Sequence, residues 1–198
     1  MVWQEKVNCI LFLGHRWDMY TDMFTENFVV PDLSGTPYTV EAEFSGKFNF
    51  AHETSLKVRA HSLLMRREGS NPHSINMFKV DWRDGEGFKP DLGLCELLVY
   101  IGEERTVLIH GEAGRGRTGT LMLLRMGMTA IDHGIPFDPK EQLRELRAAR
   151  AGAVEKKEQF ASCQAALHLY HLQTQTDISE KDLEEARGEV VRAWHRFR

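Results

Sequence analysis

The stretch from Val107 to Leu121, VLIHGEAGRGRTGTL, constrains the fold of this chain more than any other part of the sequence. A short apolar run enters a glycine-rich turn, and an apolar segment with helical spacing follows it. Glycines allow the backbone to turn its N–H groups inward, and a helix that begins near Arg117 directs the positive end of its dipole at the same point. Arg115 and Arg117 add guanidinium groups that match phosphate oxygens. The sequence therefore predicts an anion-binding loop between a strand and a helix.

Patterns of apolar and turn-forming residues indicate further strands and helices along the chain. Strands are expected at Val7–Leu13, Asn27–Val30, Tyr38–Phe44, Ile75–Val80 and Val107–Ile109. Helices are expected at about Glu53–Arg67, Pro90–Ile101, Thr118–Ile131, Val154–Leu172 and Ser179–Phe197. One more helix is expected to begin after an N-cap at Asp138. The segment from Ser34 to Ala51 lacks a helical period and is expected to form hairpins or an irregular face.

The order of these elements predicts the fold class. A strand feeds the loop and helices dominate after it, so we expect residues 1–198 to form a single α/β domain. Its central, mostly parallel sheet should be flanked by helices on both faces, with the ligand site at the carboxyl end of the Val107 strand. The last helix, residues 178–198, begins acidic and ends basic. Packing against its own domain is favoured, and an accessory or interface role in a scaffold protein is the alternative.

Composition argues against several other classes of protein. A net charge of −4 gives no general attraction to nucleic acid. No segment approaches the ~20 apolar residues of a transmembrane helix, and no signal peptide is expected. The cysteines Cys9, Cys95 and Cys163 lie far apart and lack metal-ligand spacing. We therefore expect buried thiols, a reducing, cytoplasmic location, and neither a metal nor another cofactor.

The loop carries a specific set of residues in the pattern HxxAGxGRTG, from His110 to Gly119. This set resembles the phosphate loop of the cysteine-dependent protein tyrosine and dual-specificity phosphatases, which reads His-Cys, five residues, Arg, then Ser or Thr. The resemblance implies that Arg117 and the loop backbone hold a phosphate, that His110 helps to fix the loop, and that the Thr118 hydroxyl supports a thiolate. The phosphate-binding residues implied are Glu112, Ala113, Gly114, Arg115, Gly116 and Arg117. The nucleophile position holds Gly111.

Two other segments resemble catalytic parts of the same family. Residues 81–85, Asp-Trp-Arg-Asp-Gly, resemble the mobile Trp-Pro-Asp loop with Arg83 in place of proline. Asp84 would then be the general acid, and Asp81 is the reserve candidate. Residues 147–159 resemble the segment that ends in a water-positioning glutamine, which would be Gln159. Its arginines, Arg147 and Arg150, are expected to brace loops by ion pairs rather than to touch substrate.

The loop also bears on the class of ligand. Its GRGR core and TGTL ending look most like the dual-specificity branch. The resemblance implies a phosphorylated protein or another phosphate ester as partner, with a phosphate- or sulfate-like anion in the loop. Arg115 could favour an inositol phosphate or phosphoinositide, whereas Glu112 adds negative charge at the rim. A nucleotide-binding P-loop is disfavoured because Gly116 is followed by Arg117 rather than by lysine.

Gly111 decides the expected activity. Hydrolysis in this family passes through a phosphocysteine, and glycine offers no nucleophile, so we expect this chain to be inactive. Loss of the thiolate also removes a negative charge that faces the phosphate, so binding should be retained. Two histories remain open: Gly111 replaces the cysteine of a working enzyme, or the chain is a natural pseudophosphatase that binds phosphorylated partners. The presence of Asp84, Thr118 and Gln159 favours the first slightly.

Overall fold

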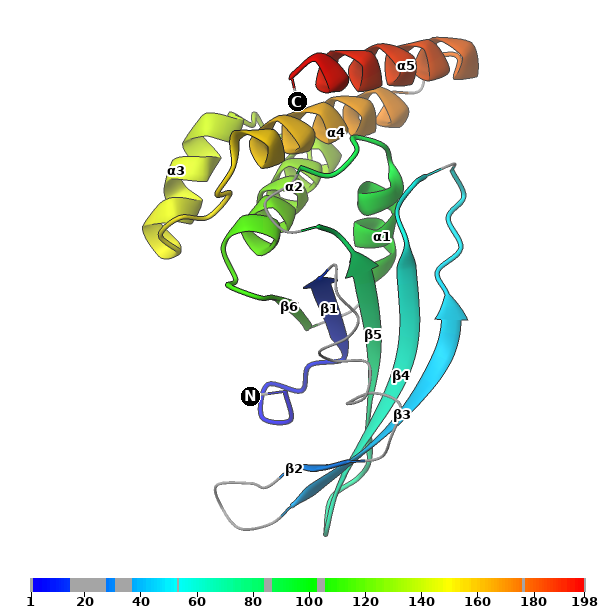
Figure 1. Ribbon diagram of the computed structural model, residues 1–198, viewed down its shortest axis with the longest axis vertical. Helices are drawn as coiled ribbons and strands as arrows, with labels where there is room; N and C mark the ends of the chain where they lie inside the picture. Colours follow the sequence, from blue (N-terminus) through cyan, green and yellow to red (C-terminus); the bar gives the residue numbers. More distant parts are fainter. Residues whose placement is uncertain are drawn as a thin grey trace. The chain divides into compact units, whose positions relative to one another are not determined.

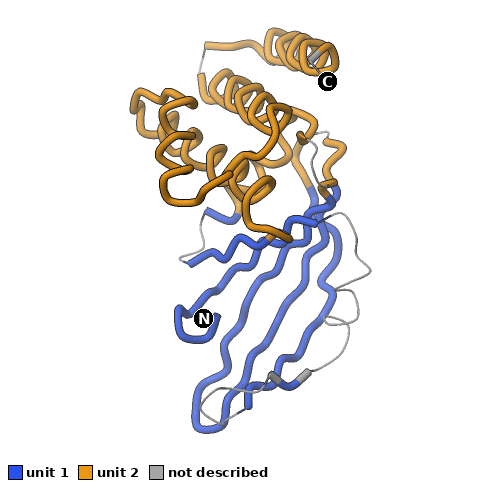
Figure 2. Tube along the Cα trace, turned by 60° about the vertical axis from the view of Figure 1, so that its left-hand side comes forward, with its two compact units in different colours: residues 1–49, 57–81, 101–110 blue, residues 50–56, 82–100, 111–198 orange. Residues whose placement is uncertain are grey.

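A computed structural model describes residues 2–14, 28–30, 37–52, 54–83, 87–102, 106–175 and 177–197. The chain divides into two compact units, which Figure 2 shows in different colours. The first unit comprises residues 1–49, 57–81 and 101–110, and the second comprises residues 50–56, 82–100 and 111–198. Strands make up the first unit and helices the second, so the expected α/β class is confirmed (Figure 1).

The strands of the first unit form one six-stranded sheet in the order β2-β3-β4-β5-β1-β6. Their bounds are β1 Cys9–Gly14, β2 Phe28–Val30, β3 Tyr38–Lys47, β4 Val58–Arg67, β5 His73–Asp81 and β6 Val107–Gly111. β1 runs parallel to β5, whereas the pairs β2–β3, β3–β4 and β4–β5 are antiparallel. The sheet is therefore mixed, and the expectation of a mostly parallel sheet was wrong. A connection as short as that between β4 and β5 can join only antiparallel neighbours.

The prediction of a helix at Glu53–Arg67 was also wrong, because Val58–Arg67 is strand β4. Leu56, Ala60, Leu63 and Leu64 satisfy a helical spacing, but Leu63 is buried in the sheet core with Val40, Ile75 and Met77. β4 pairs along most of its length with β3 on one side and β5 on the other. Those two ladders outweigh a local helical pattern. The expected start at Glu53 lies outside the described residues.

The other expected strands are confirmed with small shifts at their ends. Asn27, the expected first residue of β2, lies outside the described residues. In the segment from Ser34 to Ala51, residues 34–36 also lie outside the described residues. Most of the remainder is strand β3, which pairs with β4 and has a register shift between Phe44 and Gly46. The interpretation of hairpins was thus correct for this part, whereas an irregular face was not.

The helices of the second unit are α1 Gly93–Ile101, α2 Gly116–Asp132, α3 Pro139–Ala149, α4 Lys157–Thr174 and α5 Glu180–Phe197. The cap expected for α3 is confirmed, because the Asp138 carboxylate accepts a hydrogen bond from the backbone N–H of Lys140 at 2.9 Å. The two leucines of α3, Leu143 and Leu146, are half-buried. No helix in the described residues is long and apolar enough to cross a membrane.

Helix α4 packs between α2 and α5 in this unit (Figures 1 and 2). The two helices α2 and α4 approach closely at Gly127, where an added Cβ would lie 2.5 Å from the Leu167 side chain. On its other side α4 holds α5, because the Trp194 Nε1–H donates to the Ser162 hydroxyl at 3.0 Å. Helix α5 therefore packs against α4 of its own unit, and an interface role for residues 178–198 stays a prediction.

Gly119, in the first turns of α2, permits a second close approach. A Cβ at this position would lie 2.6 Å from the backbone nitrogen of Val154 and 3.0 Å from Ala153. Backbone atoms cannot move aside as a flexible side-chain end can, so only glycine fits here. Gly119 thus sets how closely the turn before α4 approaches the start of α2.

We expect Gly119→Ala to lower the free energy of unfolding by about 2 kcal/mol or more, because the added methyl group overpacks this contact. Urea unfolding followed by circular dichroism measures the change. Gly188→Ala in α5 is the matched control, since its new Cβ would meet only the flexible Arg192 guanidinium at 3.1 Å. Alanine should there raise stability by about 0.5–1 kcal/mol. Equal effects of the two substitutions would contradict the packing argument.

Candidate phosphate-binding site

A cavity of about 240 Å³ in the second unit is lined by the loop from Gly111 to Thr118 and by Glu155. All six residues expected to bind phosphate line this cavity, together with Gly111 and Thr118. Gly114 adopts a left-handed conformation with φ of +63°, which glycine reaches without strain. Helix α2 begins at Gly116, so its first N–H groups border the cavity. The arrangement can bind an anion with backbone N–H groups and a helix N-terminus.

The Arg117 guanidinium is held in place within this loop. Its side chain is only 6% exposed, and Nη1 donates to the Trp82 carbonyl oxygen at 2.9 Å. Its Nη2 lies 3.6 Å from a carboxylate oxygen of Glu112, whose side chain is 82% exposed. An exposed carboxylate contributes little binding energy, so an incoming phosphate can displace it from the arginine.

Two arginines of the α3–α4 region brace the loop, as expected from the sequence, but they bind carbonyl oxygens rather than carboxylates. Arg150 Nη2 donates to the Ala113 carbonyl at 3.1 Å. Arg147 donates from Nε to the Ala153 carbonyl at 2.9 Å and from Nη2 to the Val154 carbonyl at 2.8 Å. The Val154 N–H in turn donates to the Arg115 carbonyl at 3.3 Å. The braces thus connect the turn before α4 to the loop.

Val154 carries strain in this turn. Its φ is +55°, a left-handed conformation that β-branched residues rarely adopt, and its side chain is buried. Such strain persists only where the surroundings fix the backbone. The hydrogen bonds of Arg147 and the contact with Gly119 provide that constraint.

The Thr118 hydroxyl is buried at the loop cavity and has no hydrogen-bond partner among the described residues. The neighbouring Thr120 hydroxyl, by contrast, donates to the Gly116 carbonyl at 2.8 Å. Buried hydroxyl groups are usually paired, so an unpaired one at an anion site is informative. The loop retains the hydroxyl that the resemblance assigns to supporting a thiolate, while Gly111 supplies no thiol.

Gln159, in the first turn of α4, lies against the start of α2. Its side chain is 1% exposed, and Oε1 accepts a hydrogen bond from the Lys156 N–H at 3.2 Å. Its Nε2 has no partner among the residues described. A Cβ at Gly116 would lie 3.0 Å from this Nε2, so glycine permits the approach. A buried amide donor therefore lies beside the loop.

Of the remaining sequence candidates, two belong to the first unit and one lies outside the described residues. His110 belongs to the first unit, where its exposed ring stacks on Phe12 with centroids 5.5 Å apart. Asp81, the reserve acid, ends strand β5 of the same unit. Asp84, the expected general acid, lies outside the described residues. The sequence did not reveal two contributors, the Trp82 carbonyl and Glu155, because neither belongs to the loop motif that identified the site.

The cysteines offer no replacement nucleophile. Cys9, Cys95 and Cys163 are all buried, as expected. Burial raises the pKa of the Cys163 thiol to about 12. Burial, with smaller effects of Cys163 and Asp91, raises the pKa of the Cys95 thiol further. Neither thiol of the second unit forms an appreciable thiolate near neutral pH.

Comparison with known families identifies the chain. The family model described as protein-tyrosine phosphatase matches residues 1–168. The chain belongs to the protein-tyrosine phosphatase family. The match includes the loop and most of α4, whereas α5 lies beyond it.

Relatives in other organisms carry the same family name. The chain is 25% identical over 118 residues to the tyrosine-protein phosphatase Lar of Drosophila melanogaster, covering 56% of this chain and 6% of that protein. It is 34% identical over 70 residues to the human tyrosine-protein phosphatase non-receptor type 4, covering 35% of this chain and 8% of that protein. The chain thus spans less than a tenth of the length of either relative.

A solved structure agrees on the fold. The protein tyrosine phosphatase TcPTP1 of Trypanosoma cruzi superposes with a TM-score of 0.69 at 18% identity, covering 96% of this chain and 65% of that one. The expected protein tyrosine phosphatase-like fold is therefore confirmed.

We expect Thr118→Val to leave the free energy of unfolding unchanged or to raise it by up to about 1 kcal/mol, because it removes a buried hydroxyl without a partner. Thr120→Val is the matched control and should lower it by about 1 kcal/mol, because its hydroxyl donates to the Gly116 carbonyl. Thermal or urea unfolding measures both. A clear loss of stability in Thr118→Val would show that this hydroxyl is paired in solution.

Proposed function

We propose that this member of the family binds phosphomonoesters in the loop from His110 to Arg117 and does not hydrolyse them. The observation that carries the proposal is the loop cavity, which combines backbone N–H groups, a helix N-terminus and the buried Arg117 guanidinium. The hydrogen bond to the Trp82 carbonyl orients this guanidinium at the loop, where its charge would attract the phosphate oxygens. Pre-orientation lowers the entropic cost of binding.

The lack of hydrolysis follows from the chemistry of the loop. The family's displacement forms a bond from a cysteine sulfur to phosphorus and breaks the bond to the leaving oxygen. Gly111 has no atom that can form this bond, and the buried thiols of Cys95 and Cys163 are protonated. Without a thiolate, no fixed negative charge at position 111 repels the phosphate dianion, so binding does not depend on turnover.

The ligand we propose is a phosphorylated protein. The names of the relatives favour phosphotyrosine as the ligand, whereas the GRGR core of the loop resembles that of the dual-specificity phosphatases. An inositol phosphate is the second candidate because Arg115 projects at the loop. Its guanidinium lies 3.9 Å from the Glu155 carboxylate, which reduces the charge available to a multiply phosphorylated ligand. The net charge of −4 argues against nucleic acid, and the buried thiols favour a cytoplasmic location.

We further propose that Gly111 stands within otherwise complete catalytic machinery, as expected if it replaces the cysteine of a working enzyme. Arg117 would bind the phosphate, Thr118 would stabilise a thiolate, and Gln159 would position water with its unpaired amide. Asp84 would protonate the leaving oxygen, with Asp81 as the reserve. The alternative is a natural pseudophosphatase, which needs Arg117 but neither the acid nor the amide.

Phosphate binding should depend on Arg117. We expect Arg117→Met to weaken binding of phosphotyrosine and of vanadate at least about tenfold, because charge-assisted hydrogen bonds are lost. Isothermal titration calorimetry measures both ligands. Arg144→Met on α3 is the control, since Arg144 is exposed and pairs with Glu141 on its own helix. Equal affinity of Arg117→Met and the unmodified chain would refute the proposed site.

Gly111→Cys should create activity toward p-nitrophenyl phosphate that vanadate inhibits, because it supplies the missing nucleophile. Gly111→Ala is the matched control, since it adds a Cβ without a thiol and should stay inactive. In the cysteine variant, Asp84→Asn should slow turnover of phosphopeptides, whose leaving groups are poor, by about 10²–10⁴-fold. A folded cysteine variant without activity would favour the natural pseudophosphatase over the altered enzyme.

A further inference from the structure

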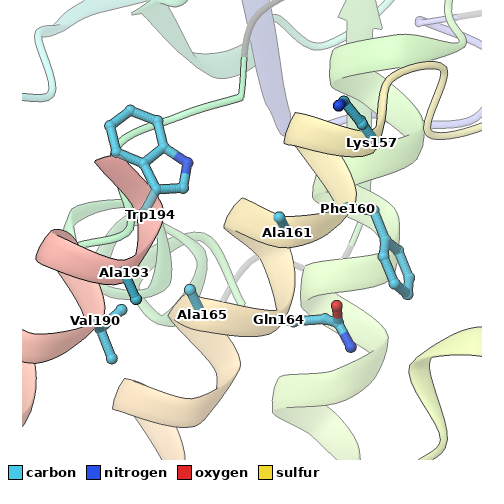
Figure 3. A pocket seen from close by; sticks show the side chains of 8 residues that line it. All are labelled: Lys157, Phe160, Ala161, Gln164, Ala165, Val190, Ala193 and Trp194. Atoms are coloured by element: carbon cyan, nitrogen blue, oxygen red, sulfur yellow. The ribbon is translucent and has the colours of Figure 1, made fainter. Parts of the chain in front are cut away.

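A groove lies between α4 and α5 in the second unit, with a volume of about 490 Å³ (Figure 3). Its lining is mostly apolar, with small side chains from both helices: Ala161 and Ala165 on α4, and Ala193 on α5. Phe160, Val190 and Trp194 add larger apolar surfaces. The alanines leave room that bulkier residues would fill, and the volume lies in the range of ligand-binding pockets. We call this feature the α4–α5 groove.

The groove is formed by helices that are fixed to each other. Trp194 is only 9% exposed, and its indole N–H donates to the buried Ser162 hydroxyl of α4. Ser162 also donates to the Glu158 carbonyl one turn earlier, so the contact is tied to the α4 backbone. The groove therefore exists before any partner binds, which reduces the cost of binding.

The groove begins beside the loop cavity. Glu155 lines the cavity and Lys157 lines the groove, two residues further along the chain. The backbones of Glu155 and Lys157 are at most about 7 Å apart, so an extended peptide of several residues has the length to run from the loop cavity to this end of the groove. The Lys157 side chain is 75% exposed at this end of the groove.

We infer that the α4–α5 groove binds a bulky apolar side chain of the phosphorylated partner, a few residues from the phosphorylated one. This inference rests on the proposed function, because the phosphate in the loop places the flanking residues next to Lys157. The phosphate provides the charged contact, and the apolar side chain selects among phosphorylated sequences. Linking two contacts raises affinity because the second one forms within a single complex.

Synthetic phosphotyrosine peptides test this inference with the full chain. One peptide carries alanine at about four positions on each side of the phosphotyrosine, and the others carry a single leucine at one of these positions. We expect at least one leucine to tighten binding about tenfold, as burial of an apolar side chain predicts. Fluorescence anisotropy of labelled peptides measures the dissociation constants.

Ala161→Trp and Ala193→Trp should each abolish the leucine gain by filling the groove. Both should leave the affinity for the all-alanine phosphopeptide within about twofold, since neither alters the loop. Ala193 is exposed, so its variant remains informative if Ala161→Trp unfolds. Glu145→Trp, at an exposed position on α3, is the control and should retain the gain.

The outcomes separate this inference from the proposed function. If the all-alanine phosphopeptide binds in an Arg117-dependent way but no leucine improves binding, only the groove inference is overturned. A leucine gain that survives both tryptophan variants overturns it as well. If no phosphopeptide binds, the proposed function fails and the inference fails with it. Sedimentation that finds a dimer, converted to a monomer by both tryptophan variants, would identify the groove as an interface between two copies and overturn the inference.

Discussion

The hydrogen bond between the buried Arg117 guanidinium and the Trp82 carbonyl is the interaction on which the loop depends. A guanidinium cannot lose its proton in a protein, so a buried one requires acceptors or anions around it. The carbonyl satisfies one edge, and the exposed Glu112 carboxylate approaches the other only at 3.6 Å. The Arg117 guanidinium is therefore held at the base of the loop by a buried carbonyl on one edge and a solvent-exposed carboxylate on the other.

Gly111 separates two properties that a thiolate would combine. The proposed anion binding would use the backbone of residues 111–118, Arg117 and the dipole of α2, none of which requires a side chain at position 111. Bond formation to phosphorus would require one. Among the residues described, the Thr118 hydroxyl and the Gln159 amide nitrogen have no hydrogen-bond partner. On the proposed function, the loop would therefore bind phosphate without a thiol, whereas turnover would require one.

The sequence predicted the position of the loop between a strand and a helix better than it predicted the sheet, for a physical reason. The loop motif is local, so neighbouring residues along the chain determine its backbone. Strand β4 is determined by partners far along the chain, and its pairing with β3 and β5 overrides the helical spacing of Leu56, Ala60, Leu63 and Leu64. The Trp82 carbonyl could not be predicted as the partner of Arg117, because every residue carries a carbonyl. The cap at Asp138 was predictable because its hydrogen bond is local.

The left-handed Val154 gives helix α3 a meaning that its burial does not suggest. None of the residues of α3 is buried, so the helix contributes little to a hydrophobic core. It does carry Arg147, whose guanidinium holds both carbonyls of the turn at Ala153 and Val154. Helix α3 therefore holds the strained turn at Val154 in place against the loop from Gly111 to Thr118. A change that displaced this surface helix would break the hydrogen bonds of Arg147 and alter the loop without contacting it directly.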